Sequence, residues 1–187
     1  EALAGYDAAL ALRPGDPLAR FHKSLSRLLT EDYAGAWSDY ETRLLSEDVP
    51  HRPRGYPRWD GAPAAGSTVL VYGEQGLGDE IMFASCLPDL MRSGVRCVVE
   101  CHASLCALFA GSFPDATVYA TLADRRVPDA IHALGIDWEV PIGSLAMVYR
   151  KRAADFPHHR GYLQASPERV SAWRERLAAL GPGPKIG

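Results

Sequence analysis

Residues 73–79 combine glycines with acidic and amide side chains, in a pattern that could bind a ligand or remove a proton from it. The sequence there is Gly73-Glu74-Gln75-Gly76-Leu77-Gly78-Asp79. Glycines let the backbone turn sharply and come close to a ligand. Asp79 has two possible roles: a helix cap that accepts backbone N–H bonds, or a general base toward a hydroxyl. Glu74 is either a ligand contact or part of a solvated rim, so the spacing alone leaves both choices open.

The elements around this loop follow an α/β pattern. The β-branched apolar run 68–72 predicts a strand buried on both faces. A helix is expected over 80–93, kinked at Pro88 and closed by Gly94. Its predicted inward residues are Ile81, Met82, Ala84, Leu87 and Leu90. The loop therefore joins a buried strand to a helix N-terminus, whose free N–H groups suit a phosphate or a developing negative charge.

Further elements predict a parallel sheet. Strands are expected at 95–101 and 116–119 with a short helix at 104–110 between them, which implies right-handed crossovers. Residues 131–134 and 141–145 are expected to supply another short strand and loop. A last helix is predicted over 167–180, capped by Ser166 and stopped by Gly181. Its inner stripe would be Val170, Trp173, Leu177 and Leu180, and a strand would open at Lys185-Ile186-Gly187.

The loop does not carry the usual phosphate-binding patterns. No Lys-Ser or Lys-Thr follows the glycines, which disfavours a P-loop NTPase. The third glycine of the dinucleotide fingerprint is also absent, because Ile81 follows Gly76 and Gly78 at that spacing. Glu100 lies near the end of the second strand, so a ribose-binding acidic residue and a dinucleotide site remain an alternative.

An internal repeat precedes the α/β region. Ala2, Leu3, Tyr6 and Leu10 recur 34 residues later as Ala36, Trp37, Tyr40 and Leu44. Helices are expected over 17–30, with Ser24 as a small packing residue, and over 33–46. The first of these should bury one stripe made of Leu18, Phe21, Leu25, Leu28 and Leu29. This pattern resembles the tetratricopeptide family, whose period is about 34 residues. Arg43 stands where the preceding repeat has Ala9, which predicts that the superhelix ends there.

Residues 47–67 are expected to be a linker, because prolines and glycines exclude a long helix or a central strand. Trp59 is its expected anchor. The arginines could meet a phosphate or form a solvated basic loop; they are Arg52, Arg54 and Arg58.

Other polar residues give weaker signals. His158-His159-Arg160 is either a solvated loop or a phosphate contact lining a cleft, and adjacent histidines do not readily share one metal. Asp137 and Trp138 could line a sugar subsite, although a single aromatic residue is more often part of the core. Ser144 lacks the flanking pattern of a nucleophile elbow.

Composition narrows the classes of partner. The formal net charge of −3 gives no reason to expect nucleic acid or an anionic membrane. No apolar run approaches the roughly 18 residues of a membrane span, and no secretory signal is recognisable. Cys86, Cys97, Cys101 and Cys106 lack paired metal-ligand spacing and are expected to be reduced, mainly buried thiols. These features predict a cytoplasmic protein without a metal.

The run Val71-Tyr72-Gly73-Glu74-Gln75-Gly76-Leu77-Gly78-Asp79-Glu80-Ile81-Met82-Phe83-Ala84 resembles the glycosyltransferase domain of bacterial tetratricopeptide-repeat proteins. It is similar, more distantly, to the heptosyltransferases of lipopolysaccharide synthesis. The resemblance implies a GT-B architecture and inverting, metal-independent transfer from a nucleotide-sugar to a protein or glycan acceptor, with no other cofactor. It implies that Asp79 is the general base and that the loop contacts substrate through Glu74, Gln75, Gly76, Leu77 and Gly78.

The expected organisation is the end of a tetratricopeptide array at 1–46, the linker at 47–67 and a Rossmann-like N-terminal glycosyltransferase domain at 68–187. We expect further repeats upstream and a donor-binding domain downstream, so that these 187 residues alone lack transferase activity. The alternative function is a non-catalytic scaffold whose repeats bind a protein partner. The two hypotheses combine if the repeats recruit a protein acceptor, such as a surface or flagellar protein.

Overall fold

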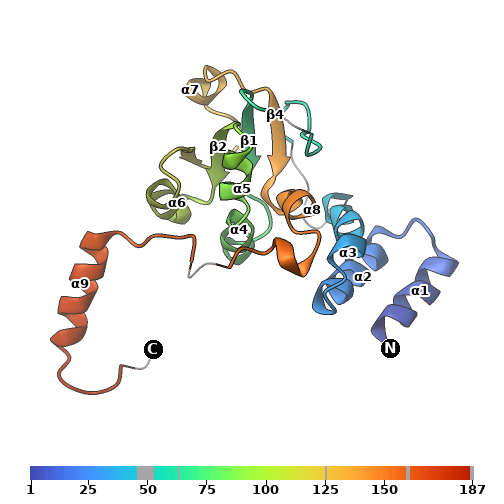
Figure 1. Cartoon of the computed structure of the whole chain (residues 1–187), viewed down its shortest axis with the longest axis horizontal. Coiled ribbons are helices and arrows are strands. Elements are labelled where there is room, and N and C mark those ends of the chain that lie inside the picture. The colour runs from blue at the N-terminus through green and yellow to red at the C-terminus, as the bar shows by residue number, and fades with distance from the viewer. Residues whose placement is uncertain (46–52, 63, 125, 159–160, 186–187) are drawn as a thin grey trace.

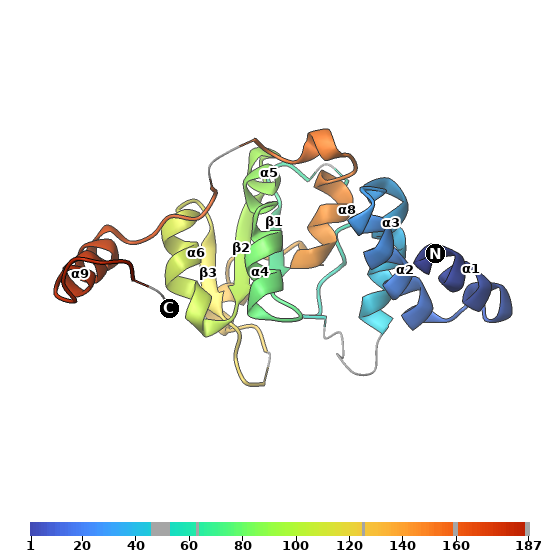
Figure 2. The ribbon, with the colours of Figure 1, turned by 90° about the horizontal axis from the view of Figure 1, so that it is seen from below.

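The computed structural model of the chain describes residues 1–45, 53–62, 64–124, 126–158 and 161–185. Figure 1 shows a central sheet with helices packed on it, and Figure 2 shows the order of the parts along the molecule. Helices α1 to α3 lie at one end, α8 separates them from the sheet, and α9 lies at the other end. Parts of several predicted segments lie outside the described residues. They are Ser46 of the helix expected over 33–46, residues 47–52 and Pro63 of the linker, His159 and Arg160, and Ile186 and Gly187 of the expected strand.

The N-terminal helices are α1 (Ala2–Leu12), α2 (Pro17–Leu29) and α3 (Tyr33–Tyr40). Asp16 begins α2 by accepting from the backbone N–H groups of Leu18 and Ala19, each at 3.0 Å. Ser24 is fully buried, as predicted. The helix expected over 33–46 instead tightens at residue 41 into the 3-10 helix η1 (Glu41–Leu45).

The predicted apolar stripe of the second helix is only partly correct. Phe21 and Leu28 pack against the core, but Leu18 and Leu25 are exposed and Leu29 is 86% exposed. The periodicity located an amphipathic helix correctly, because its apolar residues do recur at helical spacing. It overestimated how much of that face the neighbouring helices cover.

Four parallel strands form the sheet: β1 (Thr68–Tyr72), β2 (Arg96–Cys101), β3 (Thr117–Ala120) and β4 (Trp138–Pro141). Their order is β3-β2-β1-β4, so the chain adds strands on one side of β1 and then returns to its other side. This is a Rossmann-like α/β arrangement, which confirms the predicted α/β class. The order reverses between β1 and β4, and ligands of open parallel sheets bind beside such a reversal.

The helix predicted over 80–93 is wrong as a single element. The chain forms α4 (Leu77–Ala84) and then α5 (Leu87–Arg92). Pro88 lies in the first turn of α5, where a missing N–H costs nothing, so it belongs to a helix start and not to a kink. Met82 was expected to point inward but is exposed, and Phe83 is buried in the core instead.

Short helices complete the domain after β2. They are η2 (Ala103–Leu105), α6 (Cys106–Ser112), α7 (Asp129–His132), η3 (Ile142–Ser144), α8 (Leu145–Tyr149) and η4 (Ala153–Asp155). The strand-and-loop interpretation of 131–134 is therefore wrong, because α7 ends within it at His132 and a turn follows at 133–134. The fourth strand instead lies just before residue 142.

The two faces of the sheet carry different layers, since alternate strand residues point to opposite sides. On one face, Val69, Val71 and Val99 belong to a core shared with α4, α5, α6 and α8. Trp37 and Tyr40 of α3 belong to this same core, so the hydrophobic contact is continuous from the N-terminal helices to the sheet. On the other face, Leu70 and Val98 form a smaller cluster with residues near α7.

The described part of the linker lies along β4. The backbone N–H of Trp59 donates to the carbonyl of Glu139 at 2.8 Å, and the N–H of Glu139 donates to the carbonyl of Pro57 at 2.8 Å. Arg58 and Glu139 consequently form a parallel bridge beyond the edge of the sheet. Trp59 is buried, which confirms its role as an anchor.

The last helix, α9 (Pro167–Ala178), begins as predicted: Ser166 Oγ accepts from the N–H of Arg169 at 3.4 Å. Its apolar stripe does not face inward. Trp173 is 50% exposed, Leu177 and Leu180 are also exposed, and none of the residues of α9 is buried. Figures 1 and 2 show α9 standing apart from the sheet.

Candidate functional site at the end of β1

The glycine loop leaves the carboxyl end of β1, which pairs with β2 on one side and with β4 on the other. Gly73 continues the ladder by donating its N–H to the carbonyl of Glu100 at 2.8 Å. Gln75 then adopts a φ of 60°, a left-handed conformation that non-glycine residues seldom take. Gly76 follows as the N-cap of α4. The left-handed residue of the loop is therefore Gln75 and none of its glycines.

Asp79 lies in the first turn of α4, and its side chain is half-buried. Its Oδ2 accepts the N–H of Gly76 at 3.0 Å. Among the described residues, Oδ1 accepts no hydrogen bond. The capping role and an exposed carboxylate oxygen therefore coexist on Asp79, one on each oxygen. Leu77 and Gly78 are exposed beside it.

Glu74 forms an ion pair with Arg43 that the sequence did not predict. Its Oε1 accepts Arg43 Nη2 at 2.5 Å, and both of its oxygens lie 3.2 Å from Arg43 Nε. The N–H of Gly143, in the loop after β4, donates to the same Oε1 at 3.2 Å. Arg43 is 6% exposed, and although burial alone lowers the pKa of its guanidinium, Glu74 raises it overall. Arg43 therefore lies between the loops that follow β1 and β4, and this contact does not test the prediction that a repeat array ends there.

Further polar side chains close this cluster. Ser144 Oγ accepts Arg43 Nη2 at 2.9 Å and donates to Glu41 Oε1 at 2.8 Å. Arg58 contacts both Glu41 and Ser144, the latter at 3.0 Å. Two arginines and two glutamates therefore balance their charges around one buried hydroxyl, so each charged group has a partner.

Glu80 lies behind the loop and is buried. Its Oε2 accepts the N–H of His102 at 2.9 Å, which links the start of α4 to the end of β2. Burial raises the pKa of Glu80 above its usual value of 4.5, and the His102 N–H only partly offsets this. A Cβ added to Gly73 would come within 2.5 Å of Glu80 Oε1, so the glycine makes room for this carboxylate.

The raised pKa of Glu80 predicts a pH-dependent loss of stability. Above pH 4.5 the folded chain holds more protons on this group than the unfolded chain does, so the free energy of unfolding falls as pH rises toward the raised pKa. Glu80→Gln removes this dependence. Urea unfolding from about pH 4 to about pH 7 should show the wild type losing stability relative to Glu80→Gln. The exposed Glu168→Gln is the matched control, and a pH-independent difference for Glu80→Gln would contradict the expectation.

Glu100 does not have the surroundings of a ribose-binding residue. It is buried and forms an ion pair with Arg54, whose Nε donates to Glu100 Oε2 at 2.8 Å. Tyr119 also donates to Oε2, at 2.8 Å. The dinucleotide alternative depended on Glu100 as a ribose-binding residue, and Glu100 is instead bonded to Arg54 and Tyr119. Arg54 and Arg58 likewise do not form a solvated basic loop, because each meets a carboxylate.

The other candidates lie elsewhere. Asp137 accepts the N–H of Thr68 at 2.8 Å, so it marks the amino end of β1, opposite the glycine loop. Trp138 packs against the core. His158 is exposed. None of these three residues joins the site at the carboxyl end of β1.

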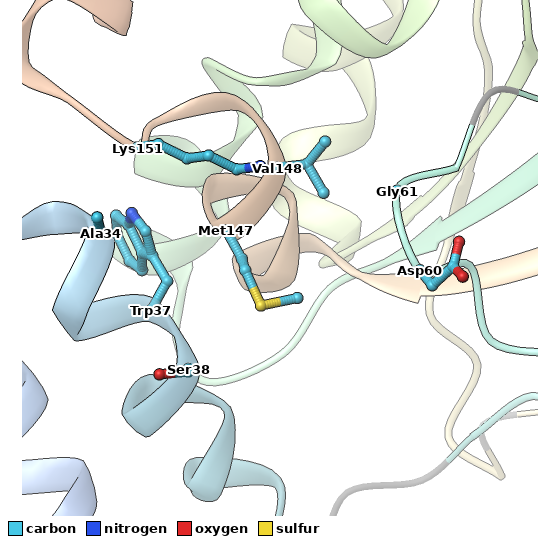
Figure 3. Close-up of a pocket in the computed structure, with 8 residues that line it drawn as sticks. All are labelled: Ala34, Trp37, Ser38, Asp60, Gly61, Met147, Val148 and Lys151. Carbon is cyan, nitrogen blue, oxygen red and sulfur yellow. The ribbon is translucent and has the colours of Figure 1, made fainter.

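A pocket of about 350 Å³ lies between α3, α8 and residues 60–61. Figure 3 shows Trp37 and Ser38 on its α3 side and Asp60 on its linker side. No residue of the glycine loop lines it. The pocket lies where α3 meets α8, so it is separate from the site at the end of β1.

The cysteines are free thiols: three are buried and Cys106 is half-buried. Burial raises the pKa of the Cys97 thiol to about 12, which keeps it protonated at neutral pH. In the described part of the chain, no three His, Cys, Asp or Glu side chains group closely enough to hold a metal ion. Across the same residues, every helix falls short of the length or the hydrophobicity that crossing a bilayer requires.

Comparison with known proteins finds a similar curated protein. No family model matches the chain, and no solved structure matches it. The chain is similar to Protein FlbA of Caulobacter vibrioides, with 32% identity over 204 residues that cover 100% of this chain and 34% of the relative. The chain therefore spans about a third of the length of that curated relative. The relative's name states no chemistry.

Proposed function

We propose that this chain contributes the acceptor-activating part of a glycosyltransferase, which moves a sugar from a nucleotide-sugar to a hydroxyl on a protein or glycan. The resemblance of residues 71–84 to bacterial repeat-containing glycosyltransferases suggests the reaction. The structural observation that supports it is the Asp79 carboxylate. It follows the loop at the end of β1, beside the strand-order reversal, with one oxygen bonded to Gly76 and the other unpaired among the described residues.

In the proposed reaction, Asp79 Oδ1 accepts the proton of the acceptor hydroxyl as its oxygen attacks the anomeric carbon. The bond from that carbon to the nucleoside diphosphate breaks, and the diphosphate leaves with the electron pair. The bond between Oδ2 and the Gly76 N–H holds the carboxylate in one orientation meanwhile. Gly76, Leu77 and Gly78 are the loop residues free to approach substrate, whereas Glu74 contributes through Arg43.

Asp79→Asn in the natural full-length protein tests this role. An asparagine keeps an oxygen for the Gly76 N–H but is not a base, so we expect transfer to fall by about 10²–10⁴-fold. The assay is release of nucleoside diphosphate from a panel of nucleotide-sugars, with acceptor protein present. Exposed Asp115→Asn, at the opposite edge of the sheet, is the matched control. Transfer by Asp79→Asn within a few-fold of the wild type would remove Asp79 as the base.

A second candidate function is protein binding by the N-terminal helices. Leu12, Leu18 and Leu29 are exposed on these helices and are available for contact with a partner. We propose that these helices, as the end of a tetratricopeptide array, hold the protein acceptor. If the natural full-length protein binds an acceptor protein but releases no nucleoside diphosphate from any nucleotide-sugar of the panel, the non-catalytic scaffold function is the favoured one.

A further inference from the structure

Arg43, in the 3-10 helix that follows α3, contacts the glycine loop directly. Arg43 leaves η1 and lies between the loop after β1 and the loop after β4, with 5% of its side chain exposed. It contacts Glu74 through two nitrogens and Ser144 through Nη2 at 2.9 Å. A guanidinium can contact both loops at once because its donors form a planar fork.

The residue after Glu74 is held by the same helical segment. Gln75 Nε2 donates to the hydroxyl of Tyr40 at 3.0 Å, and the Tyr40 ring lies 4.5 Å from Arg43 Cζ. Gln75 is also the loop residue with a φ of 60°. Glu74 and Gln75 are therefore both held by side chains of α3 and η1. Gln75 is the residue with the left-handed backbone conformation.

The fit is tight on the β4 side as well. A Cβ added to Gly143 would lie 2.8 Å from Glu74 Oε1 and 3.0 Å from Arg43 Nη2. At these distances the neighbouring atoms must move, so Arg43, Glu74 and Gly143 pack with no spare room. The loop is thus held by the contacts of Glu74 with Arg43, of Gln75 with Tyr40 and of Asp79 with the Gly76 N–H.

We infer that Arg43 is a positioning residue for the glycine loop. Through Glu74 it sets the conformation of residues 74–76 and hence the orientation of the Asp79 carboxylate, so the N-terminal helices are part of the site and not an appended module. This inference rests on the proposed function only for its effect on transfer, since its effect on loop order can be measured without any reaction.

Hydrogen exchange of the loop amides tests the inference in this chain. Arg43→Met keeps a long apolar side chain but leaves Glu74 without its cation. We expect the hydrogen-bonded amides of Gly73, Gly76, Glu80 and Gly143 around the loop to exchange about tenfold faster or more, whereas amides of β2 change little. Arg43→Lys should give an intermediate rate, because a lysine keeps the charge but cannot contact both loops in the same way.

The matched control is Trp37→Phe. It removes the bond from Trp37 Nε1 to the Arg150 carbonyl, 2.6 Å long, which joins α3 to α8 without touching the loop. If Arg43→Met and Trp37→Phe raise exchange by the same factor in the loop and in β2, the effect is general destabilisation and the inference is wrong. Should Arg43→Met not fold, Glu74→Gln supplies the same comparison, with the same expected and contradicting outcomes.

Transfer by the natural full-length protein separates this inference from the proposed function. A positioning role predicts that Arg43→Met lowers kcat by about tenfold or more while the KM for the nucleotide-sugar stays within a few-fold. If Asp79→Asn leaves transfer unchanged but loop exchange rises in Arg43→Met, the proposed base fails and Arg43 still positions the loop. If loop exchange does not rise, the positioning role fails whatever Asp79 does.

Discussion

Arg54→Met is expected to lower the free energy of unfolding by about 3–5 kcal/mol, the usual cost of removing one partner of a buried ion pair. The side chains of Arg54 and Glu100 are 2% and 1% exposed. Without Arg54, the Glu100 carboxylate would keep the Tyr119 hydroxyl but lose its counter-charge in a buried position. The Arg54 guanidinium also lies 4.7 Å from the centre of the Tyr72 ring, a contact that methionine only partly replaces.

Urea unfolding followed by circular dichroism measures this loss. Arg126→Met is the control, because Arg126 and Asp124 form an ion pair with 61% of each side chain exposed, and such pairs contribute about 1 kcal/mol or less. In the double variant Arg54→Met/Glu100→Gln, much of the loss should be recovered since no unpaired charge remains. A loss below about 1 kcal/mol for Arg54→Met would show that water reaches Glu100.

Trp37→Ala is expected to cost about 3–5 kcal/mol, because it removes a large buried ring from the joint between the N-terminal helices and the α/β unit. The Trp37 ring packs edge-on against Tyr40 at 5.6 Å and Phe83 at 6.4 Å between centroids. Its loss also leaves the buried carbonyl of Arg150 without the indole N–H.

The same variant reports on how the parts unfold together. In the wild type, helical and near-ultraviolet signals should disappear in one transition, because one core spans α3 and the sheet. In Trp37→Ala we expect α1 to α3 to unfold at lower denaturant than the sheet. Trp173→Ala on the exposed α9 is the control, and it should shift the midpoint little. An equal shift for both variants would contradict a joint held by Trp37.

Local sequence predicted the elements that depend on local residues. The β-branched apolar run at 68–72 predicted β1 as a strand buried on both faces, with the bounds that the structure shows. Ser166 and Pro167 predicted the start of α9. Pro88 was misread because proline both interrupts a helix and begins one, and only the break at Ser85 distinguishes the two.

The site was predictable only in part, for a physical reason. Asp79 and the glycines lie together in the sequence, so their loop could be recognised. Arg43 is 31 residues from Glu74 (74 − 43), and Ser144 is farther still, so their contacts arise only when the strand order brings the loops together. The one sequence signal for this contact is the charged Arg43, which stands 34 residues after Ala9 and predicts only the end of a repeat array there.

The segment beside β4 affects what the sheet can do with other chains. A free sheet edge presents unpaired N–H and carbonyl groups that can recruit a strand from another molecule. Residues 57–59 occupy those groups at Glu139, and Pro57 has no N–H of its own to offer. The opposite edge, β3, is only four residues long. Loss of the contacts between residues 57–59 and Glu139 would therefore leave β4 an uncovered edge strand that can template edge-to-edge aggregation.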